Sequence, residues 1–319
     1  MAGILEMLKT HCSIVILVFM FAVFFPVILC GATINVPVDY ATIQEAVEIA
    51  EDGDEIIVSP GIYTENPELR GVSIILRSTD PDDEDIVKQT VIDGGGTGSV
   101  ITFDGDEPST SALSGFTIRS GSGDSGGGID GNGCETLISK NRIIENRARS
   151  SGGGIFNCHG KIFGNLISGN ASDNYGGGVA YAPGIVTGNI IRNNVAVQAG
   201  GLFQCYGYVH ANLIHENRGD ETGGGMQDCS ALIADNIIYD NISGGAGGGL
   251  YNCSGTILNN TVARNEAAIG GGLARCQGFI VNNIIWNNTA ATHSTLYGCA
   301  NPIYCCVEGV EEENGNISF

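Results

Sequence analysis

The stretch GGGVAYAPGIVTGNIIRNN, from Gly176 to Asn194, is followed by two close variants of itself that begin at Gly200 and Gly223. Each variant holds a glycine cluster, one apolar residue directly after it, and two asparagines that are five residues apart. A period of about 24 residues is typical of a solenoid, in which each repeat forms one turn and packs against the next. The repetition therefore predicts a solenoid fold.

The asparagines recur with little change in spacing along most of the chain. The first series is Asn141, Asn165, Asn189, Asn212, Asn236, Asn260 and Asn283, and the second is Asn146, Asn170, Asn194, Asn217, Asn241, Asn265 and Asn288. We expect each series to stack on successive turns, with left-handed backbone angles at the asparagines and hydrogen bonds between their amides. The glycines are expected where a tight bend leaves no room for a side chain.

Apolar residues in each repeat are mostly β-branched, and they come in short runs that end at glycine or asparagine. No repeat holds a helical period longer than about two turns, which excludes helical repeats. About three short strands in each repeat fit a parallel β-helix, whose turns are about 4.8 Å apart.

The opening of the repeat region, INVPVDYATIQEAVEIAEDGDEIIVSPGIYTE (Ile34–Glu65), and the motifs GGG-[ILV] and N-x-I-x-x-N carry a family resemblance. They resemble the single-stranded right-handed parallel β-helix proteins of the pectate-lyase-like superfold. They are most similar to secreted or surface-displayed bacterial proteins related to the repeats of polymorphic outer membrane proteins. The resemblance covers roughly residues 34–317. It implies an all-β fold with an N-terminal capping helix near residues 41–50, and it says more about fold than about catalysis.

Residues 1–32 differ from the repeats in composition. An apolar run from Ser13 to Leu29 ends in the small residues of Cys30–Ala32. This pattern predicts a secretory signal peptide, with an uncleaved N-terminal anchor as the alternative.

The rest of the chain, residues 33–319, is expected to form one β-helix. Its turns are less regular over 33–125 and follow the regular repeat over 126–300. The sequence stops at Phe319 without an evident cap, so we expect a truncated C-terminal end, beyond which an anchor could lie.

The chain carries 35 acidic residues against 14 lysines and arginines, a formal charge of −21. This charge argues against nucleic acid and against anionic membrane surfaces as partners. It would also repel an anionic polysaccharide unless Ca²⁺ bridged the two. The segment RGDET (Arg218–Thr222), expected to be a loop, holds two carboxylates but no calcium motif. We therefore expect no resident cofactor, and Ca²⁺ is the one ion left open.

Cysteines recur four residues after most glycine clusters, and Ala182 occupies the same place in one repeat. A position that accepts both residues is small and apolar, which favours an internal column of thiols. Disulfides between neighbouring turns, or at Cys305 and Cys306, are the alternative, because export favours oxidation. The spacing of cysteine and histidine matches no zinc site.

One outward-facing column of residues, three positions after the first asparagines, could carry chemistry. It places Arg192, His215 and Tyr239 on consecutive turns, with Glu216 and Asp240 beside them. A guanidinium, an imidazole and carboxylates within reach of one another could bind a sugar acid or abstract a proton next to a carboxylate. Arg192, His215, Glu216 and Asp240 are thus the candidate catalytic residues, and an ordinary polar surface is the alternative.

Aromatic side chains at outward positions are the candidate ligand-binding residues. In the same column, Tyr239 and the chain's one tryptophan could stack on sugar rings. A second column, two residues after the glycine clusters, places aromatic residues on alternate turns, where they could form a platform for sugars or be partly buried under loops. The candidates are Tyr239, Trp286, Phe156, Phe203 and Tyr251.

Catalytic motifs of related enzymes are missing. Lys88, Lys140 and Lys161 are the only lysines after the signal segment, and no cluster of three aspartates accompanies them. The segment DPDDED (Asp80–Asp85) reads as a lone acidic loop.

These observations favour a monomeric, secreted or cell-surface protein that presents a rigid face to a polysaccharide, a cell-surface glycan, a matrix or another cell without catalysing a reaction. A membrane would be reached only through an N-terminal or C-terminal anchor. The alternative is a polysaccharide lyase, or a related polysaccharide-modifying enzyme, with a shallow groove.

Overall fold

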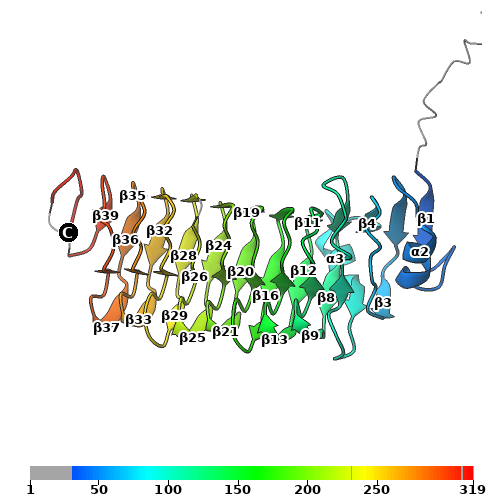
Figure 1. Cartoon of the computed structure of the whole chain (residues 1–319), viewed down its shortest axis with the longest axis horizontal. Helices are drawn as coiled ribbons and strands as arrows, with labels where there is room; N and C mark the ends of the chain where they lie inside the picture. The colour runs from blue at the N-terminus through cyan, green and yellow to red at the C-terminus, as the bar shows by residue number, and fades with distance from the viewer. Residues whose placement is uncertain (1–30, 231, 310–311, 319) are drawn as a thin grey trace, which may run out of the picture. The chain divides into compact units, whose positions relative to one another are not determined.

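Successive repeats pair through parallel strands in register, so that each repeat forms one turn of a right-handed parallel β-helix. The all-β fold class predicted from the repeats is therefore confirmed. The turns follow one another in chain order, from β1 to β39 (Figure 1). The computed structural model describes residues 31–230, 232–309 and 312–318, and the expected signal segment lies outside them except for Gly31 and Ala32.

The strands form four parallel sheets, which we name A to D. Sheet A contains β1 (Thr33–Val36), β2 (Glu55–Val58), β4 (Ile75–Ser78), β7 (Ala112–Ser114), β11 (Leu137–Ser139), β15 (Lys161–Phe163), β19 (Ile185–Thr187), β23 (Tyr208–His210), β27 (Ile233–Ala234), β31 (Ile257–Leu258) and β35 (Ile280–Val281). Sheet B contains β3 (Gly61–Thr64), β5 (Thr90–Asp93), β8 (Thr117–Arg119), β12 (Arg142–Ile144), β16 (Leu166–Ser168), β20 (Ile190–Arg192), β24 (Leu213–His215), β28 (Ile237–Tyr239), β32 (Thr261–Ala263), β36 (Ile284–Trp286) and β39 (Cys306–Val307). Sheet C contains β6 (Ile101–Thr102), β10 (Ile129–Asp130), β14 (Ile155–Phe156), β18 (Val179–Ala180), β22 (Leu202–Phe203), β26 (Met226–Gln227), β30 (Leu250–Tyr251), β34 (Leu273–Ala274) and β38 (Leu296–Tyr297). Sheet D contains β9 (Ser122–Ser125), β13 (Arg147–Ser151), β17 (Ala171–Ser172), β21 (Val195–Gln198), β25 (Arg218–Thr222), β29 (Ile242–Ser243), β33 (Glu266–Ile269) and β37 (Thr289–Thr292).

A regular turn thus holds four short strands, not the three expected from the sequence. The strand that the sequence analysis missed lies in sheet D. In β25, the segment Arg218–Thr222 was expected to be a loop, because its outward residues are polar and a glycine interrupts it. Its backbone nevertheless pairs with β21 and β29 on the neighbouring turns.

Two short helices accompany the strands. Helix α2 (Ile43–Ile49) confirms the helix expected near residues 41–50, and it begins at a capping box formed by Thr42 and Glu45. It packs Ile43, Ala46 and Val47 into the core beside β1 and β2 (Figure 1). The second helix, α3 (Glu84–Gln89), was not expected, and it begins at Asp83, which accepts hydrogen bonds from the amides of Asp85 and Ile86.

Both asparagine series form the buried ladders that the sequence predicts. Asn194, for example, donates from its Nδ2 and its backbone amide to Oδ1 of Asn217 on the next turn, at 3.0 and 3.1 Å. Asn217 donates in the same way to Asn241. These residues are fully buried, so the ladder supplies partners for polar groups that no water reaches.

The expected left-handed angles at the ladder asparagines are wrong. The left-handed residue is the one before each asparagine, such as Glu216, Asp240 or Arg264, with φ between 53° and 55°. A single left-handed residue turns the chain at the corner and points its side chain to solvent, whereas the asparagine that follows points into the core. The ladder therefore depends on the inward direction of asparagine and not on its tolerance of unusual angles.

The glycine clusters lie at another corner, as expected, and backbone crowding explains them. A Cβ built on Gly154 would lie 2.6 Å from the carbonyl oxygen of Gly178 on the next turn, and one on Gly153 would lie 2.4 Å from that of Ala171. Real Cβ atoms do not come so close to backbone. Only glycine therefore fits where successive turns approach at this corner.

Cysteines line one corner of the core as an internal column of thiols. Cys158, Cys205, Cys229, Cys253 and Cys276 are fully buried and free, and Ala182 occupies the one gap among them. Cys134 is also buried and free. The sequence pattern did not reveal it, because it follows its glycine cluster by six residues instead of four. The thiol column is therefore the observed arrangement within the described residues.

Candidate functional site

The outward column of sheet B has the register that the sequence predicts. In β20, β24 and β28, the Cα of Arg192 pairs with that of His215, and His215 pairs with Tyr239. The column continues through Ala263 to Trp286 on β32 and β36. Successive residues of a strand point to opposite faces of its sheet. The side chains of this column therefore share the outer face, whereas Ile214 and Ile238, which directly precede His215 and Tyr239, point into the core.

Side chains of this column stack on one another. The rings of His215 and Tyr239 lie 4.8 Å apart with an angle of 7° between their planes. On the next turn, the guanidinium carbon of Arg264 lies 5.1 Å from the centre of the Tyr239 ring. This packing leaves His215 only 8% exposed, so its imidazole is largely covered by its neighbours.

The carboxylates beside this column already have partners. Asp240 accepts two hydrogen bonds of 2.8 Å from Arg264, which hold the pKa of Asp240 below its usual range. Glu216 lies 3.1 Å from Nδ1 of His215, but the two atoms are not aligned for a hydrogen bond. Three of the four candidate catalytic residues thus lie together, and neither carboxylate is free of a nearby basic group.

Arg192 is the exception in this group. It is half-buried, its Nε has no hydrogen-bond partner, and no carboxylate lies within ion-pair distance of it in the described part of the chain. Partial burial of a guanidinium without a hydrogen-bond partner costs free energy of folding. Such a guanidinium also offers its N–H donors to an anionic or polar ligand. Of the candidate catalytic residues, Arg192 is the one available for such a ligand.

The second candidate column, on sheet C, forms an aromatic cluster on the outer face. Phe156 and Phe203 flank Ala180, and Tyr175 and Tyr181 cover it. The Tyr175 ring stacks on Phe203 with centroids 4.8 Å apart, and Tyr181 meets both phenylalanines edge to face at 5.4 and 5.6 Å. Phe203 is 3% exposed, whereas Phe156 and both tyrosines are half-buried. The accessible rings include two tyrosines that the sequence analysis did not single out.

The remaining ligand-binding candidates lie apart from this cluster. Tyr251, on the same sheet, accepts a hydrogen bond of 3.1 Å from Arg275 at its hydroxyl. Trp286 is half-buried near the last turn of sheet B. The structure therefore does not bring the five aromatic candidates together into one site.

The acidic loop is not isolated, contrary to the expectation from the sequence. It folds back with α3 over sheet B, where Asp82 lies 2.6 Å from Lys140 and Glu84 lies 2.9 Å from Lys88. Glu84 also lies 4.0 Å from Arg142. Asp82 and Glu84 thus meet Lys140 and Arg142, which are distant in the sequence, and only the return of this loop in three dimensions reveals these contacts.

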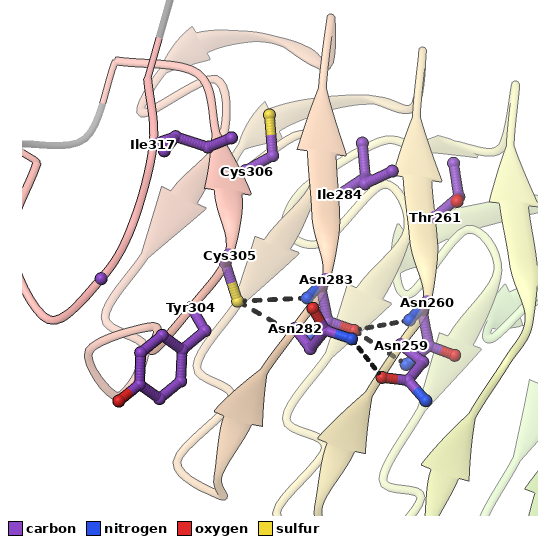
Figure 2. Close-up of a pocket in the computed structure, with 11 residues that line it drawn as sticks. Asn259, Asn260, Thr261, Asn282, Asn283, Ile284, Tyr304, Cys305, Cys306 and Ile317 are labelled. Atoms are coloured by element: carbon purple, nitrogen blue, oxygen red, sulfur yellow. Dashed lines mark hydrogen bonds between the residues drawn. The ribbon is translucent and has the colours of Figure 1, made fainter.

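A shallow hollow of about 470 Å³ lies at the corner between sheets A and B, near Tyr304 and Ile317 (Figure 2). There Cys305 takes the place of a ladder asparagine, and its Sγ accepts a hydrogen bond of 3.2 Å from the amide of Asn283. None of the residues that line this hollow is charged. It therefore offers neither a carboxylate nor a basic side chain to a ligand.

Within residues 31–230, 232–309 and 312–318, no three histidine, cysteine or acidic side chains gather in a group that could hold a metal ion. In the same part of the chain, no helix is both long and apolar enough to cross a membrane. Comparison with protein-family models, with curated proteins and with solved structures finds no match for this chain.

Proposed function

We propose that this chain is a non-catalytic β-helix protein of the pectate-lyase-like superfold that binds a glycan on its rigid outer surface. The aromatic cluster of sheet C is the observation that carries the proposal. Half-buried Phe156 on sheet C, and Tyr175 and Tyr181 beside it, expose part of their surface. Rings of this kind bury apolar sugar faces with little loss of side-chain entropy.

Polar groups next to the aromatic cluster suit sugar hydroxyls. On the following turns, Nε2 of Gln227 donates to Oε1 of Gln198 at 2.9 Å, and Thr222 donates to Gln227 at 2.7 Å. Asp228, one residue further on, accepts a hydrogen bond of 2.6 Å from Asn252. Gln227 is buried, so the half-buried side chains of Gln198 and Asp228 are the ones that can exchange hydrogen bonds with sugar hydroxyls, at little entropic cost because they are already ordered.

The charge pairing on sheet B supports a non-catalytic role. Asp240 is neutralised by Arg264, and His215 is covered by Tyr239 and faces Glu216. A general base has to reach its substrate and hold a free lone pair toward it. The covered His215 fails the first condition, and the hydrogen bonds from Arg264 already occupy the carboxylate of Asp240.

Export, a monomeric state and a glycan partner outside the cell belong to the same proposal. The apolar segment before the solenoid supports export. The formal charge of −21 favours a neutral glycan over an acidic one in the absence of Ca²⁺.

The proposal is tested by binding of the full chain to a panel of plant, algal and bacterial polysaccharides, with and without Ca²⁺. Tyr181→Ala should weaken binding about tenfold, because a buried aromatic anchor contributes roughly 1–2 kcal/mol. Tyr208→Ala is the matched control, since Tyr208 is 56% exposed on sheet A. Equal binding by the two variants would exclude the aromatic cluster as the site.

A polysaccharide lyase remains the second candidate because the guanidinium of Arg192 has no partner among the described residues and lies one turn from His215. The same panel, followed by the absorbance of unsaturated uronates and by reducing ends, tests this alternative. Product that vanishes in His215→Ala or Arg192→Ala would establish catalysis. Binding without product would support the non-catalytic proposal.

A further inference from the structure

A second cavity lies where the acidic loop and α3 fold over sheet B. It has a volume of about 390 Å³, comparable to small-ligand sites. Its apolar lining comes from Leu166 and Ile190 on sheet B and from Pro81 and Val87, and Arg142 precedes Leu166 in the same column of sheet B. This cavity is separate from the aromatic cluster of sheet C, so its argument does not depend on glycan binding there.

Two glycines create the space in this cavity. Gly164 and Gly188 occupy the left-handed corner before the first asparagine ladder, with φ of 65° and 64°. Other turns carry side chains at this corner, such as Lys140 and Asn259. A Cβ at Gly164 would meet nothing within 4 Å, so the absence of a side chain leaves room for a ligand.

The charges around the cavity leave one group unsatisfied. Asp82 is paired with Lys140, and Glu84 with Lys88. Arg142 is half-buried, its guanidinium forms no hydrogen bond within the described residues, and the nearest carboxylate oxygen, on Glu84, lies 4.0 Å from it. A guanidinium carries five donors in a planar fork, and a carboxylate or phosphate matches that fork with two parallel hydrogen bonds.

We infer that this cavity binds a small organic oxyanion, whose carboxylate or phosphate pairs with Arg142 while its body rests on Leu166 and Ile190. Ion pairs with Lys140 and Lys88 neutralise Asp82 and Glu84, the two carboxylates that line the cavity, so these two do not cancel the attraction of Arg142 for an anion. The charge of the whole chain is screened beyond about 8 Å at physiological salt. The local guanidinium therefore decides the preference for an anion.

The test is a calorimetric titration of the full chain, at physiological salt, with glucuronate, glucose 6-phosphate and glucose. We expect saturable binding of at least one of the two anions and at least tenfold weaker binding of glucose. The stronger anion tells whether the site prefers a carboxylate or a phosphate. No saturable binding of either anion, or equal binding of glucose, would overturn the inference.

Two variants locate the site. Arg142→Gln should weaken binding of the anion about tenfold or more, because hydrogen bonds to charged groups contribute roughly 1.5–3 kcal/mol. Gly164→Asn should also weaken it, since asparagine accepts the left-handed corner and fills the cavity without removing a charge. The matched control is Gly169→Asn, because Gly169 has φ of 69° at the corner before the second ladder. Unchanged binding in Arg142→Gln and Gly164→Asn, with folding confirmed by circular dichroism, would contradict the assignment.

Discussion

Replacement of one ladder asparagine tests how the ladders stabilise the solenoid. In Asn217→Ala, four hydrogen bonds disappear: Asn194 loses two bonds to Oδ1, and Nδ2 of residue 217 no longer donates to Ile191 or to Asn241. A buried hydrogen bond contributes about 1 kcal/mol net. The expected loss in the free energy of unfolding is therefore about 4 kcal/mol, a large part of the 5–15 kcal/mol typical of proteins.

The assay is equilibrium unfolding in guanidinium chloride, followed by far-ultraviolet circular dichroism. Asn174→Ala serves as the control, because Asn174 is exposed and donates one bond of 3.2 Å to the carbonyl of Arg149. It should change the free energy of unfolding by no more than about 0.5 kcal/mol. A similar midpoint for the two variants would refute the claim that the ladder amides stabilise the fold.

Other substitutions test the glycine corner, the thiol column and the ion pair of sheet B. Gly154→Ala should cost about 2–3 kcal/mol in the same unfolding assay, because its Cβ would lie 2.6 Å from a carbonyl oxygen of the next turn; a neutral result would disprove crowding at this corner. Cys229→Ala should cost only about 1 kcal/mol, since alanine already occupies this position at Ala182, and a loss as large as that of Asn217→Ala would contradict a simple packing role. Iodoacetamide should label Cys299 and Cys306 before Cys229 in the native chain, because the first two are half-buried and the third is fully buried; equal labelling, read by mass spectrometry, would disprove the burial. Arg264→Met should raise the pKa of Asp240, measured by carboxyl NMR, because Arg264 holds it low. The ionised Asp240 stabilises the fold above about pH 4, and this contribution is lost as the pH falls through the lowered pKa, so an unchanged titration would exclude the ion pair in solution.

The repeat period alone predicts much of the solenoid. A residue that recurs every 23 or 24 positions has to stack on its counterpart, so the pairing of Arg192, His215 and Tyr239 across strands follows from counting. The ladders follow in the same way, because their asparagines keep the same interval as the buried isoleucines. Register is a property of the period, and the sequence displays the period directly.

Features that depend on backbone direction or on irregular segments could not be read in this way. The period does not say whether Glu216 or Asn217 carries the left-handed angle, since both stand at the same corner. The loop before α3 belongs to no repeat, so its return to Lys140 and Arg142 has no periodic signal. Cys305 likewise occupies the position of a ladder asparagine, where its sulfur accepts the same hydrogen bond. The sequence alone does not indicate this role, because the hydrogen bonds of the ladder have to be known first.

The ladders also give the solenoid a polarity. Bonds between ladder asparagines run one way: each donates to Oδ1 of the asparagine on the turn that follows, as in the run from Asn194 through Asn217 to Asn241. A stack that ended at one turn would present amide donors for which the next turn supplies the acceptor in the correct register. The ladder side chains, like the strand edges, therefore specify where the next turn docks.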